Sequence, residues 1–204
     1  MLSQSGAFMI TRLSQNPWLD PAYMLALGNQ TDLTHGDMLS YFAALPGIET
    51  LGIYIEGFKD LDGLAFAKAV RKAVLNGKQI VVYKSGRTAP GQGGVMGHTA
   101  SIAGGLTLFE SVVRHAGAIV AEDFNSFDDL FYIAGVLQGK KIGGLRIGAI
   151  SGAGFEAVGM ADNIEADSFA MEMGTLEETT VKKVEDILVA KKLDQLVEVR
   201  NPID

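Results

Sequence analysis

Residues 51–83 read LGIYIEGFKDLDGLAFAKAVRKAVLNGKQIVVY and decide the fold. Leu51–Ile55 and Ile80–Tyr83 are apolar throughout rather than alternating, which is typical of strands that are buried on both faces. Four apolar side chains between them fall on one face of a helix: Phe66, Ala69, Val70 and Val74. A strand, a helix and a second buried strand in this order predict a parallel sheet.

The same alternation continues on both sides of this unit. Apolar runs at Tyr23–Leu27 and Ala118–Ala121 predict two more buried strands. Helical apolar faces recur near 109–116 and 127–134, the latter behind a capping-box-like Ser126-x-x-Asp129. The fold class is therefore α/β, a parallel sheet with helices on both faces.

A polar, glycine-rich stretch at 138–144 interrupts the alternation, and we place a domain boundary there, giving domains 1–140 and 141–204. The second part is short for an independent α/β domain. In it we expect strands at Arg146–Ile150, Phe169–Met173 and Gln195–Val199, a helix near Phe155–Ile164, and a helical region opened by Thr175-x-x-Glu178.

Composition excludes several classes of protein. The 204 residues include no Cys, so a disulfide framework, a thiolate metal site and a Cys nucleophile are excluded. A net charge of −7 argues against a broad nucleic-acid-binding surface. No apolar run approaches the length of a membrane span, and the first six residues lack the pattern of a signal peptide. We therefore expect a cytoplasmic protein without a nucleic-acid or membrane partner.

The segment 85–101 is a long glycine-rich stretch after a strand, and His98 stands near its end. Gly86 and Gly91 have the spacing of a phosphate-binding P-loop, but Gln92 and Gly93 stand where that motif needs Lys and Ser or Thr. We expect a loop whose backbone can approach a ligand closely. Its His is either a phosphoryl acceptor or acid–base group, or simply an exposed side chain.

Three other Gly- or polar-rich turns are candidate sites, because open parallel sheets bind ligands at the carboxyl ends of their strands. Glu56 is either solvated or oriented toward a His; the turn Ser3–Gly6 is either an anion site or an ordinary helix cap. Residues 152–157 match G-x-G-x-x-A, and Glu172 lies 20 residues after Gly152, which is also compatible with a dinucleotide site.

We interpret His35, at a loop or N-cap, and His115 as structural residues. Three scattered His predict no metal site.

Together these motifs resemble the nucleoside-diphosphate-forming acyl-CoA synthetases, a family that includes ADP-forming acetyl-CoA synthetase and, more distantly, succinyl-CoA synthetase. The resemblance covers almost the whole chain, and seven motifs occur in family order: Ser3-Gln4-Ser5-Gly6-Ala7-Phe8, Gly28-Asn29-Gln30-Thr31-Asp32, Ile53-Tyr54-Ile55-Glu56-Gly57, Lys84-Ser85-Gly86-Arg87-Thr88, His98-Thr99-Ala100-Ser101-Ile102-Ala103-Gly104, Gly152-Ala153-Gly154 and Asn201-Pro202-Ile203-Asp204.

The resemblance implies a flavodoxin-like domain that carries a phosphohistidine, followed by part of a second flavodoxin-like domain. In this family an acyl-CoA reacts with phosphate to give an acyl phosphate and CoA, and a histidine then carries the phosphoryl group to ADP. His98 would be that histidine and Glu56 its orienting carboxylate. The phosphate contacts would come from Ser3, Ser5, Gly6, Gly152, Ala153 and Gly154, with Gly97, Thr99 and Ser101 supporting the loop.

The resemblance also implies CoA, ADP or ATP, phosphate and Mg²⁺ as substrates or ions. Most of their sites would lie on CoA-binding and ATP-grasp domains that act in trans. The chain departs from the family pattern at Gly97, usually Ser, and at Ala100, usually Gly, and the first strand before Ser3 is expected to be missing. A missing strand favours pairing with another chain, so we expect a homo- or hetero-oligomer.

Two alternatives stay open. One is a non-catalytic binding or scaffold subunit related to the family, which the altered residues around His98 favour. The other is a fragment of a dinucleotide-binding oxidoreductase that uses Gly152–Ala157 and Glu172.

Overall fold

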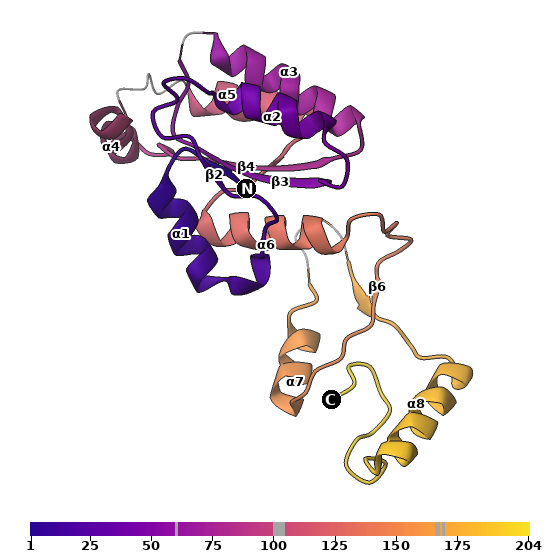
Figure 1. Ribbon diagram of the computed structural model, residues 1–204. Coiled ribbons are helices and arrows are strands. Elements are labelled where there is room, and N and C mark those ends of the chain that lie inside the picture. Colours follow the sequence, from indigo (N-terminus) through magenta and orange to yellow (C-terminus); the bar gives the residue numbers. More distant parts are fainter. Residues whose placement is uncertain (60, 100–104, 166–167, 169) are drawn as a thin grey trace. The chain divides into compact units, whose positions relative to one another are not determined.

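The computed structural model (Figure 1) describes residues 1–59, 61–99, 105–165, 168 and 170–204, and of residues 96–99 it describes the backbone only. The contacts within the chain define two compact units, Met1–Lys140 and Lys141–Asp204. Each unit is described by itself below.

Unit 1 contains a five-stranded parallel sheet in the order β2-β1-β3-β4-β5, the flavodoxin-like order. The predicted parallel sheet is therefore confirmed. Its strands are β1 (Leu2–Ser3), β2 (Leu25–Ala26), β3 (Thr50–Ile55), β4 (Gln79–Lys84) and β5 (Ile119–Val120).

Helices cover both faces of this sheet, as the sequence predicts (Figure 1). The helices of unit 1 are α1 (Gly6–Gln15), the 3₁₀ turn η1 (Pro17–Leu19), α2 (His35–Ala44), α3 (Asp62–Leu75), α4 (Ala89–Thr99), α5 (Leu106–Ala116) and α6 (Phe124–Val136). One core cluster packs α2, α3 and α5 on one face of the sheet, and a second packs α1 and α6 on the other.

Three predictions within unit 1 need correction. The expected strand Tyr23–Leu27 is regular only at Leu25–Ala26. The capping box of α6 is formed by Asp123 and Ser126 rather than by Ser126 and Asp129, because Asp123 accepts from the Ser126 N–H and Ser126 Oγ accepts from the Asp123 N–H. The first strand, which we expected to be missing, is present as β1 between β2 and β3.

Unit 2 contains a parallel pair of strands, β6 (Arg146–Ile147) and β7 (Glu172–Met173), with helices α7 (Gly154–Asp162) and α8 (Glu178–Lys191). Ile150 and Ile203 form an isolated parallel bridge. The expected strand Gln195–Val199 is wrong, because this stretch forms turns and irregular backbone. The N-cap of α8 is Glu177, so Thr175-x-x-Glu178 does not open it.

None of the helices in the described residues is both long enough and apolar enough to span a membrane.

The middle of the sheet packs so closely on α6 that one glycine is required. A Cβ built on Gly52, in β3, would lie 2.9 Å from ring atoms of Phe131. We predict that Gly52→Ala lowers the free energy of unfolding by about 1–3 kcal/mol, because the ring has to move within a packed core. Urea denaturation measures this. The control is Gly135→Ala in α6, the helix that carries Phe131. A Cβ at Gly135 meets no atom within 4 Å, so stability should not fall. Equal stability of Gly52→Ala and the wild type would contradict the packing.

Candidate functional site

Strands β1, β3 and β4 run parallel, so the turns after them meet at one edge of the sheet. The turn after β1 is Ser3–Gly6, the turn after β3 begins with Glu56, and Ser85 follows β4. The structure therefore brings the first two groups of predicted site residues to a common edge.

The turn Ser3–Gly6 opens helix α1. Ser3 Oγ donates to the Ser5 carbonyl at 2.6 Å and accepts from the Ser5 N–H at 3.2 Å, and Ser5 Oγ caps the helix by accepting from the Phe8 N–H at 3.1 Å. The first N–H groups of a helix have no acceptor within the helix, and α1 carries no acidic residue in its first turn. Its N-terminus is therefore suited to an anion.

Gln4 connects this turn to Glu56. Its side chain is buried, and its Oε1 accepts from the Glu56 N–H at 2.8 Å and the Gly57 N–H at 3.1 Å. The Gln4 N–H donates to the Tyr54 carbonyl at 3.0 Å. These bonds fix the backbone that carries Glu56 next to the start of α1.

Gln30 and His35 hold Gly57 through a second buried set of bonds. Gln30 Nε2 donates to the Gly57 carbonyl at 3.0 Å, while Gln30 Oε1 lies 3.1 Å from the His35 N–H and 2.8 Å from His35 Nδ1. Gly28 and Gln30 both have a φ of 53°, so the Gly28–Asp32 motif is a turn that places the Gln30 side chain under Gly57. His35 is fully buried as the first residue of α2, and the N-cap is Thr34.

The Glu56 carboxylate is partly exposed at this edge. Tyr54 Oη donates to Glu56 Oε1 at 3.1 Å, and burial raises the pKa of Tyr54 to about 12, so the phenol keeps its proton. Lys84 Nζ donates to the Glu56 carbonyl at 3.1 Å and the Ser85 carbonyl at 3.2 Å. Burial lowers the pKa of Lys84, and the charge of Arg87 lowers it further.

The glycine-rich segment after β4 is not a loop throughout, which corrects the prediction. Residues Ala89–Thr99 form α4, and Thr88 Oγ1 accepts from the Gly91 N–H in the first turn of this helix at 3.2 Å. The backbone of Gly97, His98 and Thr99 belongs to α4, but their side chains lie outside what the structure describes. Ser101 lies outside the described residues altogether.

Arg87 anchors the start of this segment. Its guanidinium forms an ion pair with Glu110 of α5 at 2.7 Å and lies over the Tyr83 ring, 5.9 Å from the centroid. The segment that carries His98 therefore leaves the sheet from the same edge as Glu56, from an anchored first turn.

In unit 2, the turn Gly152–Gly154 opens helix α7 and repeats the first turn's geometry. Ser151 Oγ accepts from the Ala153 N–H at 3.1 Å, as Ser3 Oγ does from Ser5. Its one proton faces two acceptors, Glu156 Oε2 at 2.6 Å and the Ala153 carbonyl at 3.1 Å. Ala153 is the N-cap and provides no side-chain cap bond. A Cβ on Gly154 would lie 2.9 Å from Asp204 Oδ2, so a carboxylate already lies beside this helix N-terminus.

Asn201 fixes the surroundings of that turn. Its Oδ1 accepts from the Ala149 N–H at 3.0 Å, and its Nδ2 donates to the carbonyls of Ile147 at 2.8 Å and Gly174 at 2.7 Å. The Asn201–Asp204 motif thus ties the ends of β6 and β7 together. Glu172, which belongs to the dinucleotide alternative, is an exposed residue of β7.

Sequence reasoning missed Gln4, Gln30, His35, Tyr54 and Lys84 as parts of this edge. Each lies in or beside a motif that we quoted, but their role depends on contacts between residues up to 53 positions apart, as for Gln4 and Gly57. Of these five residues, Lys84 could have been found from the sequence, because it is a polar residue at the end of an apolar run. Among the described residues, no group of three or more His, Asp or Glu side chains could hold a metal ion.

Comparisons with known proteins show the family to which the chain belongs. Residues 1–137 match the model of the succinyl-CoA ligase-like flavodoxin domain. The chain belongs to this family. It is 31% identical over its whole length to the ADP-forming acetate–CoA ligase of Methanocaldococcus jannaschii, and 28% identical over 88% of its length to the alpha subunit of ADP-forming acetate–CoA ligase II of Pyrococcus furiosus. It spans 27% and 36% of the lengths of these two relatives.

A solved structure matches the whole chain with a TM-score of 0.68 and 26% identity. It is the dinucleotide-forming acetyl-coenzyme A synthetase 1 of Ca. Korarchaeum cryptofilum, in complex with phosphate and ADP, and the match covers 42% of that chain. The flavodoxin-like fold and the general family that the sequence motifs indicate are therefore confirmed.

We predict that Gln4→Met destabilises the protein by about 2 kcal/mol, because the buried Gly57 N–H and the partly buried Glu56 N–H lose their acceptor. The substitution should also accelerate amide hydrogen exchange at Glu56 and Gly57 more than it does at residues of β4. The control is Gln15→Met, on an exposed position of α1. Unchanged exchange at both amides would contradict the role of Gln4.

His35 provides a pH test of the same network. Burial lowers the pKa of His35 to about 4, below its usual 6.5. The unfolded chain therefore binds a proton that the folded protein does not, and stability falls as the pH drops from 6.5 toward 4, by about 3 kcal/mol in full. Urea titrations at pH 7, 5.5 and 4.5 measure the slope. His35→Asn, which keeps a donor for Gln30, should reduce it, and an NMR titration with a His35 pKa near 6.5 would contradict the prediction.

Proposed function

We propose that this chain is the phosphohistidine-bearing core of an ADP-forming acyl-CoA synthetase. The observation that carries the proposal is the link through Gln4 between the α1 N-terminus and Glu56, at the edge from which the His98 segment leaves the sheet. An anion site and a carboxylate held at the start of a histidine-bearing segment are the groups that a phosphohistidine needs.

In the proposed reaction, phosphate attacks the thioester carbonyl of an acyl-CoA, which gives an acyl phosphate and releases CoA as the thiol. A ring nitrogen of His98 then attacks the phosphorus, the bond from phosphorus to the acyl oxygen breaks, and the acid leaves as a carboxylate. A terminal phosphate oxygen of ADP attacks phosphohistidine in turn, which forms ATP and returns neutral His98. Each step is reversible.

This chain's residues act on the phosphoryl group and the histidine. The N–H groups that open α1, together with Ser3, Ser5 and Gly6, are assigned to phosphate contacts, and Glu56 is assigned to orient the His98 ring and stabilise its cationic form. The second turn, Gly152–Gly154, shares the hydroxyl-closed geometry of the first, which supports a second phosphate contact. The alignment with the M. jannaschii relative extends over this turn, and we favour phosphate over a dinucleotide there. Gly97, Thr99 and Ser101 are assigned to support the loop around His98.

The remaining components of the reaction are proposed to act in trans. The P. furiosus relative is named as an alpha subunit, which supports a partner subunit or domain. That partner would contribute the ATP-grasp and CoA-binding domains, and with them most contacts to CoA, ADP and Mg²⁺. We propose a cytoplasmic assembly, either homo- or hetero-oligomeric.

The half-reaction with acyl phosphate tests the proposal without the partner, because acetyl phosphate can donate its phosphoryl group directly to His98. With ³²P-labelled acetyl phosphate we expect acid-labile label on the tryptic peptide 88–114, in which His98 is the one histidine. His98→Ala should abolish the label. Glu56→Gln should reduce the initial rate of labelling about 10–100-fold while the urea midpoint stays within error.

The matched control is His115→Ala, which removes an exposed histidine of α5 and should leave labelling unchanged. Label that survives His98→Ala would overturn the assignment. A folded protein that takes up no label, and still binds a partner from the same cells, would favour the scaffold alternative.

A further inference from the structure

Two lysines of unit 1 are buried, and they lie at the two ends of strand β4. Lys78 precedes the strand and is 8% exposed, and Lys84 ends it and is 2% exposed. Each ammonium donates to two backbone carbonyls. Among the described residues, no carboxylate forms an ion pair with either lysine. A charge buried against neutral acceptors costs more free energy than an apolar side chain of the same length, so packing alone explains neither lysine.

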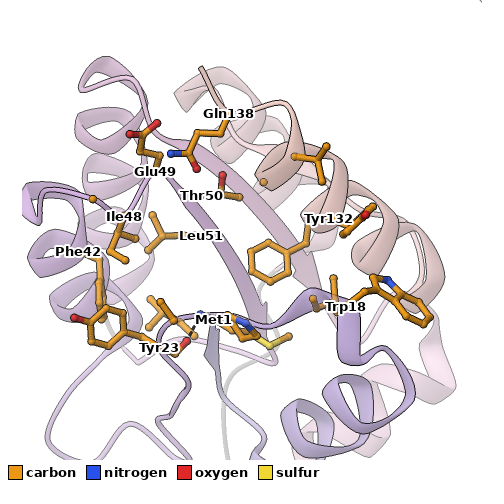
Figure 2. Close-up of a pocket in the computed structure, with 18 residues that line it drawn as sticks. Met1, Trp18, Tyr23, Phe42, Ile48, Glu49, Thr50, Leu51, Tyr132 and Gln138 are labelled. Atoms are coloured by element: carbon orange, nitrogen blue, oxygen red, sulfur yellow. Dashed lines mark hydrogen bonds between the residues drawn. The ribbon is translucent and has the colours of Figure 1, made fainter. Parts of the chain in front are cut away.

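Lys78 has a structural role. Its Nζ donates to the Leu45 carbonyl at 2.8 Å and to the Ile48 carbonyl. Both carbonyls belong to the connection between α2 and β3, so Lys78 closes this connection where β3 and β4 begin. Figure 2 shows this end of the sheet, where Ile48 packs with Leu51 of β3 and Phe42 of α2 in one core cluster. The turns after β1 and β3, which carry the proposed site residues, lie at the opposite end.

Lys84 joins two strands at that opposite end. Its Nζ donates to the Glu56 carbonyl at 3.1 Å and to the Ser85 carbonyl at 3.2 Å. Glu56 is the first residue after β3, and Ser85 is the first residue after β4. At Gly86, the next residue, φ is 76°, so the chain turns there before α4 and His98. The ammonium thus binds the first carbonyl beyond each of the two strands.

Lys84 contacts the backbone of Glu56 and not its carboxylate. Side chains alternate between the two faces of a sheet along each strand. Lys84 has the parity of Val82, which packs with α2, α3 and α5. Glu56 has the parity of Tyr54, which packs with α1 and α6. The two side chains therefore lie on opposite faces of the sheet, and Lys84 lines an apolar cavity of about 310 Å³ on its own face.

The pairing of β3 with β4 does not depend on Lys84. The two strands are in register over their whole length, from Thr50 opposite Gln79 to Ile55 opposite Lys84. The Ser85 N–H extends the ladder by donating to the Ile55 carbonyl at 2.9 Å. The ammonium adds a fixed separation between two carbonyls that lie beyond this ladder. Burial lowers the pKa of Lys84, which agrees with the cost of placing a charge there.

We propose that Lys84 is a positioning residue for phosphoryl transfer, because its ammonium holds the chain that carries Glu56 against the start of the segment that carries His98. The inference rests on the function proposed above. Without the ammonium, both strands stay paired, but the carboxylate and the histidine lose their common support. The loss affects their orientation in the transition state rather than the binding of phosphate at α1. It should therefore appear in kcat and not in KM.

Initial rates of His98 labelling at varied concentrations of ³²P-labelled acetyl phosphate test the inference. For Lys84→Met we expect kcat to fall about 10–100-fold while KM stays within about threefold. The urea midpoint should change little, because removal of the buried charge offsets the loss of two hydrogen bonds. Lys84→Arg keeps the charge and the donors and has room in the neighbouring cavity, so its kcat should stay within about threefold of the wild type.

Lys78→Met is the matched control, because it makes the same change at the other end of β4. It should leave kcat and KM unchanged per folded molecule. Lys84→Gln is a second test variant, whose side chain is too short to reach both carbonyls, and its kcat should fall as that of Lys84→Met does. Wild-type kcat in folded Lys84→Met or Lys84→Gln would overturn the inference, even where the urea midpoint falls.

A double variant tests whether Lys84 acts through Glu56. In a Glu56→Gln background, Lys84→Met should lower kcat by less than about threefold further, because the carboxylate whose position it fixes is absent. An equal loss in both backgrounds would overturn the inference. Wild-type protein that takes up no label on His98 would overturn the proposed function and this inference together, whereas labelled wild type with an unaffected Lys84→Met overturns the inference alone.

Discussion

The two hydrogen bonds that Gln4 accepts from the N–H groups of Glu56 and Gly57 tie the ends of β1 and β3 together. Without them, only the backbone pairing of β1 with β3 would connect the helix N-terminus that follows β1 with the carboxylate that follows β3. Forming these bonds requires burial of the Gln4 side-chain amide. Gln30 and His35 also fix Gly57, because Gln30 donates to its carbonyl and accepts from the His35 N–H. The candidate site is thus built on a rigid, buried polar network rather than on loop conformation.

Parallel pairing explains why this network can exist. The sheet order β2-β1-β3-β4-β5 places β1, the strand that carries Gln4, directly beside β3, which carries Glu56. Strand β4 then places Lys84 under the Glu56 carbonyl and starts the segment that leads to His98. The residues of four quoted motifs, from Gln4 to Lys84 and thus up to 80 positions apart in sequence, therefore meet at one edge of the sheet.

The sequence predicts most of the sheet because its strands are continuous apolar runs. Leu51–Ile55 and Ile80–Tyr83 extend in the structure by one residue or two, since the flanking residues continue the ladder. The helix α4 could not be predicted, because Gly91, Gly93, Gly94 and Gly97 each disfavour helix formation. The buried positions of Gln30 and His35 could not be predicted either. A turn with two positive φ values places these residues, and no periodicity in the sequence indicates such a turn. Glu56 was predictable because it follows an apolar strand, and the Ser3–Gly6 turn because its serines and glycine are typical of a helix N-terminus. The side chain of His98 lies outside what the structure describes.

The central claim is that His98 carries a phosphoryl group, and it is tested most directly on protein isolated from its own cells. Peptide mass spectrometry under non-acidic conditions should find a phosphoryl group on residues 88–114, and mild acid should remove it. Fragment ions should place that group on His98. Folded protein from actively growing cells with peptide 88–114 recovered in full and never phosphorylated would contradict the account.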